Sequence, residues 1–268
     1  MKTIEEWIEE IEDALDEGEY EGALERAEDA LAEHPRAAWL HGYRGEALAC
    51  LEDLEGAIAS YRRGVGEAPD AAELHEALAD LLFRVARFDE SREAAERALA
   101  VDPATVGALD ALSRLAEREG NIARADQLIS RARAANPEIP QPVRMRESDF
   151  RDVVTEALER LPDDFAEPLK KNLAIVVEPV PSDALIQSVD PPLDPTVLGY
   201  YVGVPLPERE PSHGPPALPD VIYLFQRNLE HESSSREVLL VEIATTVYHE
   251  VAHFLGFEED EMEDLGLE

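Results

Sequence analysis

Four prolines at a constant interval constrain the fold of this chain more than any other feature of its sequence. They stand at positions 35, 69, 103 and 137, each 34 residues after the last. A proline ends a helix, because it has no backbone N–H and its ring clashes with the preceding turn. A period of 34 residues that is punctuated in this way predicts an array of paired helices in the first half of the chain.

Small residues recur in register with the prolines. They stand twelve and five positions before each proline: Ala23, Ala57, Ser91 and Ala125 in the first set, and Ala30, Gly64, Ala98 and Ala132 in the second. Small side chains there allow two helices to cross closely. A turn between the helices of each unit is expected at 18–20, 52–54, 86–88 and 120–122. In these four registers, residues 1–137 resemble the tetratricopeptide repeat family.

This resemblance implies an all-α solenoid of four repeats over residues 1–139, with a concave groove that binds a protein or peptide. The single histidines of this half, His34, His41 and His75, are interpreted as structural or surface residues. A proline-rich linker is expected at 140–147, because prolines at 137, 140 and 142 interrupt any helix. A second domain is then predicted over residues 148–268.

Charge and cysteine content restrict the cellular setting. The net charge is −36, from 60 acidic and 24 basic residues. Such a chain lacks the basic patches that nucleic acids and anionic membranes require. The single cysteine, Cys50, excludes an internal disulfide and favours a reducing compartment. The chain shows neither an apolar signal peptide at its start nor a run of about 18 apolar residues, so a cytoplasmic location is predicted.

The second half shows a helix, three strands and a final long helix. Ser148 is expected to cap a helix over 149–161, and apolar runs predict strands near 173–177, 198–204 and 221–225. Ser234 followed three residues later by Glu237 forms a capping-box pattern before a helix over 236–255.

The final helix contains the motif His-Glu-x-x-His. His249 and His253 are four residues apart and therefore share one face of a helix. Two imidazoles at this spacing can hold a single zinc ion, and Glu250 between them can accept a proton from its water. Gly256 permits the left-handed turn that ends the helix, and an acidic residue soon after it could supply a third ligand. A chance occurrence of the motif remains the alternative, and it predicts no bound metal.

Together with Gly256 and Glu259, the motif resembles that of the minimal zincin-like metallopeptidases of bacteria. The resemblance extends over about 148–265, because the residues at 161–162, 198–203 and 219–223 match the family's helix end and two strands in order and spacing. It implies a small α+β domain that has a short sheet and a central helix with the histidine motif.

The resemblance also implies the site residues. The zinc ligands would be His249, His253 and Glu259, with Glu250 as general base. The family usually has aspartate where this chain has Glu259, so Asp260 or Glu258 could replace it as the third ligand.

The predicted function is zinc-dependent hydrolysis of peptide bonds, with the repeats binding or positioning a protein substrate. Tyr201 and Tyr223 are candidate donors to the oxyanion, and the strand at 200–204 could pair with an extended peptide. The alternative is an adaptor protein in which zinc is structural or the zincin-like domain is catalytically weak. These two readings differ in whether Glu250 is needed, since a structural site uses the histidines but no base.

Overall fold

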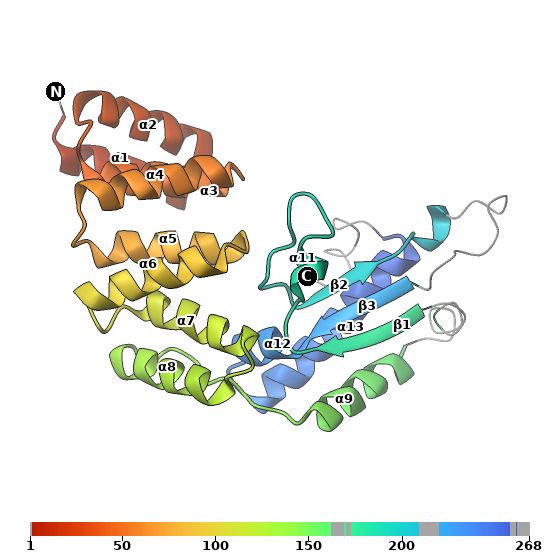
Figure 1. Cartoon of the computed structure of the whole chain (residues 1–268). Coiled ribbons are helices and arrows are strands. Elements are labelled where there is room, and N and C mark those ends of the chain that lie inside the picture. Colours follow the sequence, from red (N-terminus) through yellow and green to blue (C-terminus); the bar gives the residue numbers. More distant parts are fainter. Residues whose placement is uncertain (1, 162–168, 170–172, 209–219, 258–260, 262–268) are drawn as a thin grey trace. The chain divides into compact units, whose positions relative to one another are not determined.

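The computed structural model describes residues 2–161, 169, 173–208, 220–257 and 261 (Figure 1). The chain divides into two compact units, Met1–Ile139 and Pro140–Glu268. Each unit has hydrophobic core clusters of its own, so each is described by itself.

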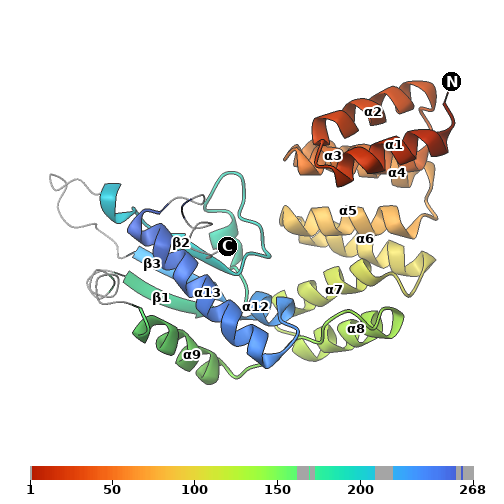
Figure 2. The same ribbon diagram turned by 180° about the vertical axis from the view of Figure 1, so that it is seen from behind.

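The first unit is built from paired helices throughout its described length. In chain order these are α1 (Ile4–Asp16), α2 (Tyr20–Glu33), α3 (Ala38–Cys50), α4 (Leu54–Glu67), α5 (Ala72–Arg84), α6 (Phe88–Val101), α7 (Val106–Arg118) and α8 (Ile122–Ala135). Successive pairs stack along the unit, as Figures 1 and 2 show. The prediction of an all-α solenoid with four repeats is confirmed.

The turn within each pair has the same backbone geometry in all four repeats. The residue two places after the first helix has a positive φ: Gly18 at 75°, Glu52 at 62°, Ala86 at 59° and Gly120 at 74°. The backbone N–H of the residue after it donates to a carbonyl in the last turn of the first helix. In the first repeat this bond runs from the Glu19 N–H to the Ala14 carbonyl, and the N···O distance is 2.8 to 2.9 Å in all four repeats. This is the Schellman motif, which satisfies carbonyls at the helix end. Two of the four left-handed positions lack glycine and carry backbone strain.

The recurring small residues lie where helices cross. Ala23, Ala57, Ser91 and Ala125 are all fully buried. Ser91 also donates a hydrogen bond from Oγ to the Ala79 carbonyl at 2.8 Å, which satisfies its buried hydroxyl. The predicted close crossing within each repeat is confirmed.

The second unit is a small α+β domain. Its elements are α9 (Glu147–Glu159), β1 (Leu173–Glu178), α11 (Asp183–Ile186), β2 (Gly199–Val202), the 3-10 turn η1 (Leu206–Glu208), β3 (Asp220–Phe225), α12 (Gln226–Glu232) and α13 (Arg236–Leu255). The sheet has the order β1-β3-β2, with β1 parallel and β2 antiparallel to β3. Helices α9 and α13 cover one face of it (Figures 1 and 2). The predicted short sheet and central helix are confirmed.

The central helix α13 buries its apolar side in the core of this unit. Leu239, Ile243 and Val247 are fully buried there. Among the described helices, α13 is long and apolar enough to cross a membrane by length and composition, and its place in the core accounts for that composition. Its N-cap is Ser235, whose hydroxyl accepts the Val238 N–H at 3.2 Å. The expected cap at Ser234 is therefore wrong by one residue.

The start of α9 also differs from the expectation. The predicted cap, Ser148, lies inside the helix, so this prediction is wrong; the N-cap is Arg146, which makes no side-chain capping bond. The first turn instead holds Glu147 and Asp149, whose negative charges favour a helix N-terminus.

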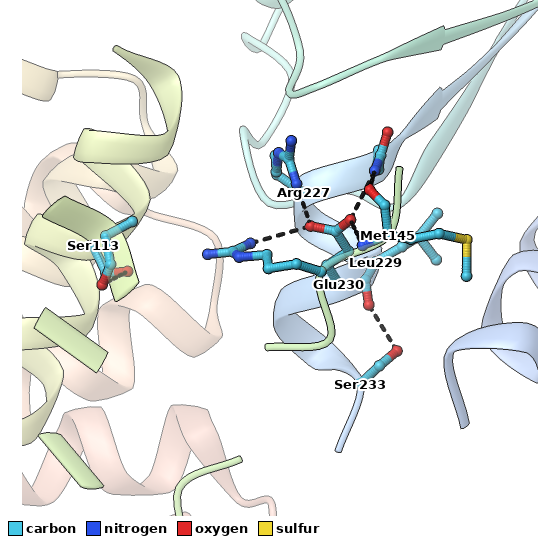
Figure 3. Close-up of polar contacts among 9 residues, drawn as sticks. Ser113, Met145, Arg227, Leu229, Glu230 and Ser233 are labelled. Carbon is cyan, nitrogen blue, oxygen red and sulfur yellow. Dashed lines mark hydrogen bonds and ion pairs between the residues drawn. The ribbon is translucent and has the colours of Figure 1, made fainter. Parts of the chain in front are cut away.

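A buried carboxylate joins the beginning of the second unit to α12. The Glu230 side chain is fully buried, and four donors surround it (Figure 3). Oε1 accepts from the Met145 N–H at 2.9 Å and from Gln226 Nε2 at 2.7 Å. Oε2 accepts from Arg144 Nη1 at 3.2 Å and from Arg227 Nη1 at 2.5 Å. The segment that contains residues 144 and 145 is thus fixed to the core rather than free.

The strained turns predict a stabilising substitution. Ala86→Gly should raise the free energy of unfolding by about 0.5–1 kcal/mol, because glycine removes the left-handed penalty but loses more entropy on folding. Gly120→Ala is the reciprocal control and should lower it by about 1 kcal/mol. An added Cβ at Gly120 meets nothing within 4 Å, so that loss would be backbone strain alone. Urea titrations followed by circular dichroism would measure both, and a destabilised Ala86→Gly variant would contradict the argument.

The Glu230 network predicts a large loss of stability from a nearly isosteric change. Glu230→Gln removes the negative charge that pairs with Arg144 and Arg227, and it places an NH₂ group, itself a donor, against donors. The free energy of unfolding should therefore fall by about 3 kcal/mol. Glu159→Gln, on the exposed side of α9, is the control and should change it by less than about 0.5 kcal/mol. Equal midpoints for the two variants in thermal unfolding would show that the network is not important for stability.

Candidate metal centre

Helix α13 brings the two histidines of the motif together near its C-terminal end. Their Nε2 atoms lie 3.0 Å apart, and the two rings stand edge to face at 84°. The helix continues without a break from its cap at Ser235 to Gly256, whose φ of 89° ends it in the left-handed conformation. The prediction that Gly256 ends this helix is confirmed. Both imidazoles therefore point their outer nitrogens at one place.

This pair of nitrogens fits a zinc ion. Zinc bonds histidine at about 2.0–2.1 Å in tetrahedral sites, which separates neighbouring ligand atoms by about 3.3 Å. The observed 3.0 Å between His249 and His253 is a few tenths of an ångström shorter. Within the described residues no third His, Cys, Asp or Glu completes a metal-binding group. The predicted third ligand, Glu259, and its alternatives Glu258 and Asp260 lie outside those residues.

Glu250 is buried beside the histidines and packed against strand β2. Glu250 is only 5% exposed. A Cβ placed on Gly199 would lie 2.7 Å from Glu250 Oε1 and 2.7 Å from Thr246 Cγ2. Any larger residue at 199 would therefore displace either the strand or the carboxylate. The sequence showed a glycine at each end of this strand but not its partner on α13.

Two cavities meet at this contact between Gly199 and Glu250. The larger has a volume of about 540 Å³ and is lined by both histidines, by Glu250 and by β2 residues. The smaller, of about 260 Å³, extends along α13 toward its N-terminus and shares His249, Glu250, Val197 and Gly199 with the larger. The histidine motif thus faces open space on both sides of the glycine.

The two candidate tyrosines differ in position. Tyr201 lines the larger cavity, donates its hydroxyl to Asp220 Oδ1 at 3.0 Å and packs edge-on against Phe254. Tyr223 lines neither cavity and stacks against Phe225. Of the two, only Tyr201 is close enough to contact a molecule in the cavity.

Asp220 is a structural residue of the site that the sequence did not reveal. It is buried at the start of β3 and also accepts the Val204 N–H at 3.2 Å. An added Cβ on Gly203 would collide with this carboxylate and with the Tyr201 hydroxyl. An acidic residue directly before an apolar run was the available signal. Asp220 fixes the end of β2 and the orientation of Tyr201.

The segment after β2 covers the end of the helix. A Cβ on Gly256 would lie 2.6 Å from Pro207, a residue of η1. Pro205 and Glu208 of the same segment line the larger cavity. Gly256 is therefore needed both for its left-handed backbone and for the close approach of this proline.

Comparison with known proteins agrees with both units. A sequence model of the tetratricopeptide repeat family matches residues 8–72 and 76–140, and one of the zincin-like metallopeptidase family matches residues 170–267. No curated protein matches the chain significantly.

Several solved repeat proteins are similar to this chain. YrrB, "a TPR protein with an unusual peptide-binding site", is 18% identical over 49% of this chain and 68% of its own, with a TM-score of 0.43. A thermophilic repeat protein of Thermus thermophilus, TTC0263, is 21% identical over 56% and 78%, with a TM-score of 0.44. The complex of the TPR2B domain of yeast Sti1 with pHsp70 is 21% identical over 48% and 95%, with a TM-score of 0.37. By its two family matches, this chain joins a tetratricopeptide repeat domain to a domain of the zincin-like metallopeptidase family.

Proposed function

We propose that this protein is a cytoplasmic, zinc-dependent metallopeptidase whose repeats bind a protein or peptide. The observation that carries the proposal is the meeting of His249 Nε2 and His253 Nε2 at 3.0 Å on the wall of a cavity of about 540 Å³. Glu250 is buried beside them on the same helix. Two nitrogen ligands, an adjacent base and a space for substrate are what metal-assisted hydrolysis requires.

The residues that would hold zinc are His249 and His253, through Nε2, and a carboxylate that follows Gly256. Glu259 is our proposal for this third ligand, because of its place in the family pattern, with Glu258 and Asp260 as alternatives. When bound, zinc supplies Lewis acidity, which polarises a carbonyl and lowers the pKa of water.

Glu250 is the residue that we propose moves the proton. Glu250 borders both cavities, and its carboxylate packs against the backbone at Gly199. A carboxylate held in this way can accept a proton from the attacking water at one oxygen and deliver it to the leaving amine. Burial at 5% exposure also keeps bulk solvent away from this transfer.

Strand β2 offers its outer edge to an extended peptide. Within the described residues the sheet ends at β2, and Val202 is 41% exposed. The Phe225 N–H donates to the Leu198 carbonyl at 2.9 Å, so these two residues form a hydrogen-bonded pair. In an antiparallel ladder every second residue forms such a pair, so the main-chain N–H and C=O groups of Tyr200 and Val202 also point toward β3. The main-chain groups of Gly199 and Tyr201 then face outward. A substrate strand added here would lie beside the histidines.

The repeats present a surface suited to a basic partner. Carboxylates stand at one equivalent position in the first three repeats: Glu12, Glu46 and Asp80. Burial raises the pKa of the Glu46 carboxyl, and the nearby charges of Glu12 and Asp16 raise it further. Trp39, two helical turns before Glu46 on the same face, is 43% exposed. We propose that a cationic protein or peptide segment binds here and relieves this repulsion.

The proposed function predicts the effect of replacing the base. Glu250→Gln should retain about one equivalent of zinc but lose peptide hydrolysis by about 10²–10⁴-fold, because the amide cannot accept the proton. His249→Ala is the companion variant and should lose the zinc itself. Metal analysis and peptide cleavage would be measured on the same full-length preparations. Unchanged activity in Glu250→Gln would contradict its role as the base, and a wild-type protein that binds zinc but cleaves no peptide would favour the adaptor alternative.

The proposed strand pairing predicts which substrate amides are needed. Single N-methylation of successive amides in a cleaved peptide should lower kcat/KM about five- to tenfold at alternate positions, because each methyl removes one hydrogen bond to Gly199 or Tyr201. Methylation of the intervening amides, which point away from β2, is the control within the same series. Losses that show no alternation would contradict binding as an added strand.

A further inference from the structure

The smaller cavity has a feature that peptide hydrolysis alone does not explain. It runs from Glu250 along α13 to Glu242, between the helix and the segment before β2. Val197 and Leu198 provide an apolar wall, and Thr245 and Thr246 line the helix side. The cavity therefore has one apolar wall, and the Glu242 carboxylate lies at the end away from the histidines.

The spacing of the two glutamates defines what can occupy this cavity. Eight residues of helix separate Glu242 from Glu250, which is about 12 Å at 1.5 Å per residue. Only a long side chain, entering beside Glu250, could approach the Glu242 carboxylate. Lysine and arginine combine such length with an apolar stem and a charged head, which suits an apolar wall that ends in a carboxylate.

Glu242 is available to bind such a cation. It is partly buried, and it has neither a hydrogen bond nor an ion pair with any residue that the structure describes. Of the described residues that line this cavity, none is a lysine or an arginine. An acidic substrate side chain would meet only repulsion there, whereas a cationic one would gain a charge-assisted hydrogen bond.

We propose that the smaller cavity selects a lysine or arginine side chain next to the scissile bond of the substrate, and that Glu242 recognises its charge. The inference rests on the peptidase function proposed above and specifies its substrate class. Glu242 acts here as a specificity residue, since it lies about 12 Å along the helix from the base and takes no part in the proton transfer.

The test uses peptides of constant composition. A single lysine is moved one position at a time through an otherwise neutral peptide, so that the net charge and any general attraction to this acidic protein stay fixed. The cleavage site of the wild-type protein should move with the lysine and keep a constant offset from it. Replacing that lysine with norleucine should lower kcat/KM at least about tenfold, the value of one charge-assisted hydrogen bond.

Two variants assign the effect to Glu242. Glu242→Gln should reduce the ratio of kcat/KM for the lysine and norleucine peptides to near one, because it removes the charge and keeps the shape. Glu237→Gln removes one charge from the exposed first turn of the same helix and should leave the ratio unchanged. A cleavage site that ignores the lysine, or a ratio that Glu242→Gln does not alter, would overturn the proposal.

A binding measurement separates this inference from the proposed activity. Fluorescence anisotropy with the full-length Glu250→Gln protein and zinc would compare the labelled lysine and norleucine peptides. Tighter binding of the lysine peptide, lost on adding Glu242→Gln but kept on adding Glu237→Gln, supports the inference even if the wild type cleaves no peptide. Equal affinities would refute it even if cleavage occurs.

Discussion

The close packing of β2 against α13 is the constraint on which the rest of the second unit depends. At Gly199 the strand backbone approaches the Glu250 side chain so closely that even a methyl group would not fit. This contact buries the proposed base, sets the distance of the sheet from the helix and divides the space beside the helix into two cavities. The histidines need only their helix, but the surroundings of the glutamate depend on a residue some fifty positions away in sequence.

The first unit uses small residues in a comparable way. Its helices cross at alanine, serine or glycine, and each repeat turns through the same Schellman motif. The difference is that the repeats apply one local solution four times, whereas the second unit depends on single contacts between distant elements. A repeated solution tolerates imperfection, as the left-handed Ala86 and Glu52 show, because each turn contributes only a small part of the total.

This difference explains what could be predicted from sequence. The repeat registers, the helix from Arg236 to Leu255 and its end at Gly256 follow from local patterns, and the structure has them where expected. The cap of this helix does not follow from sequence in the same way, because the adjacent Ser234 and Ser235 satisfy the same rule and the structure uses Ser235. The contact of Gly199 with Glu250 and the buried Asp220 could not be predicted, since both depend on how the sheet packs against the helix. The third ligand remains a prediction based on the family pattern alone.

The Glu230 network has a consequence for where the second module begins. By composition, the proline-rich stretch before residue 148 looks like a disposable connector, and a truncation would naturally be made after it. Yet the Met145 N–H and the Arg144 guanidinium supply two of the four donors to Glu230. Cutting there would leave a carboxylate in the core with half of its partners missing. The compact second unit therefore starts inside the apparent connector.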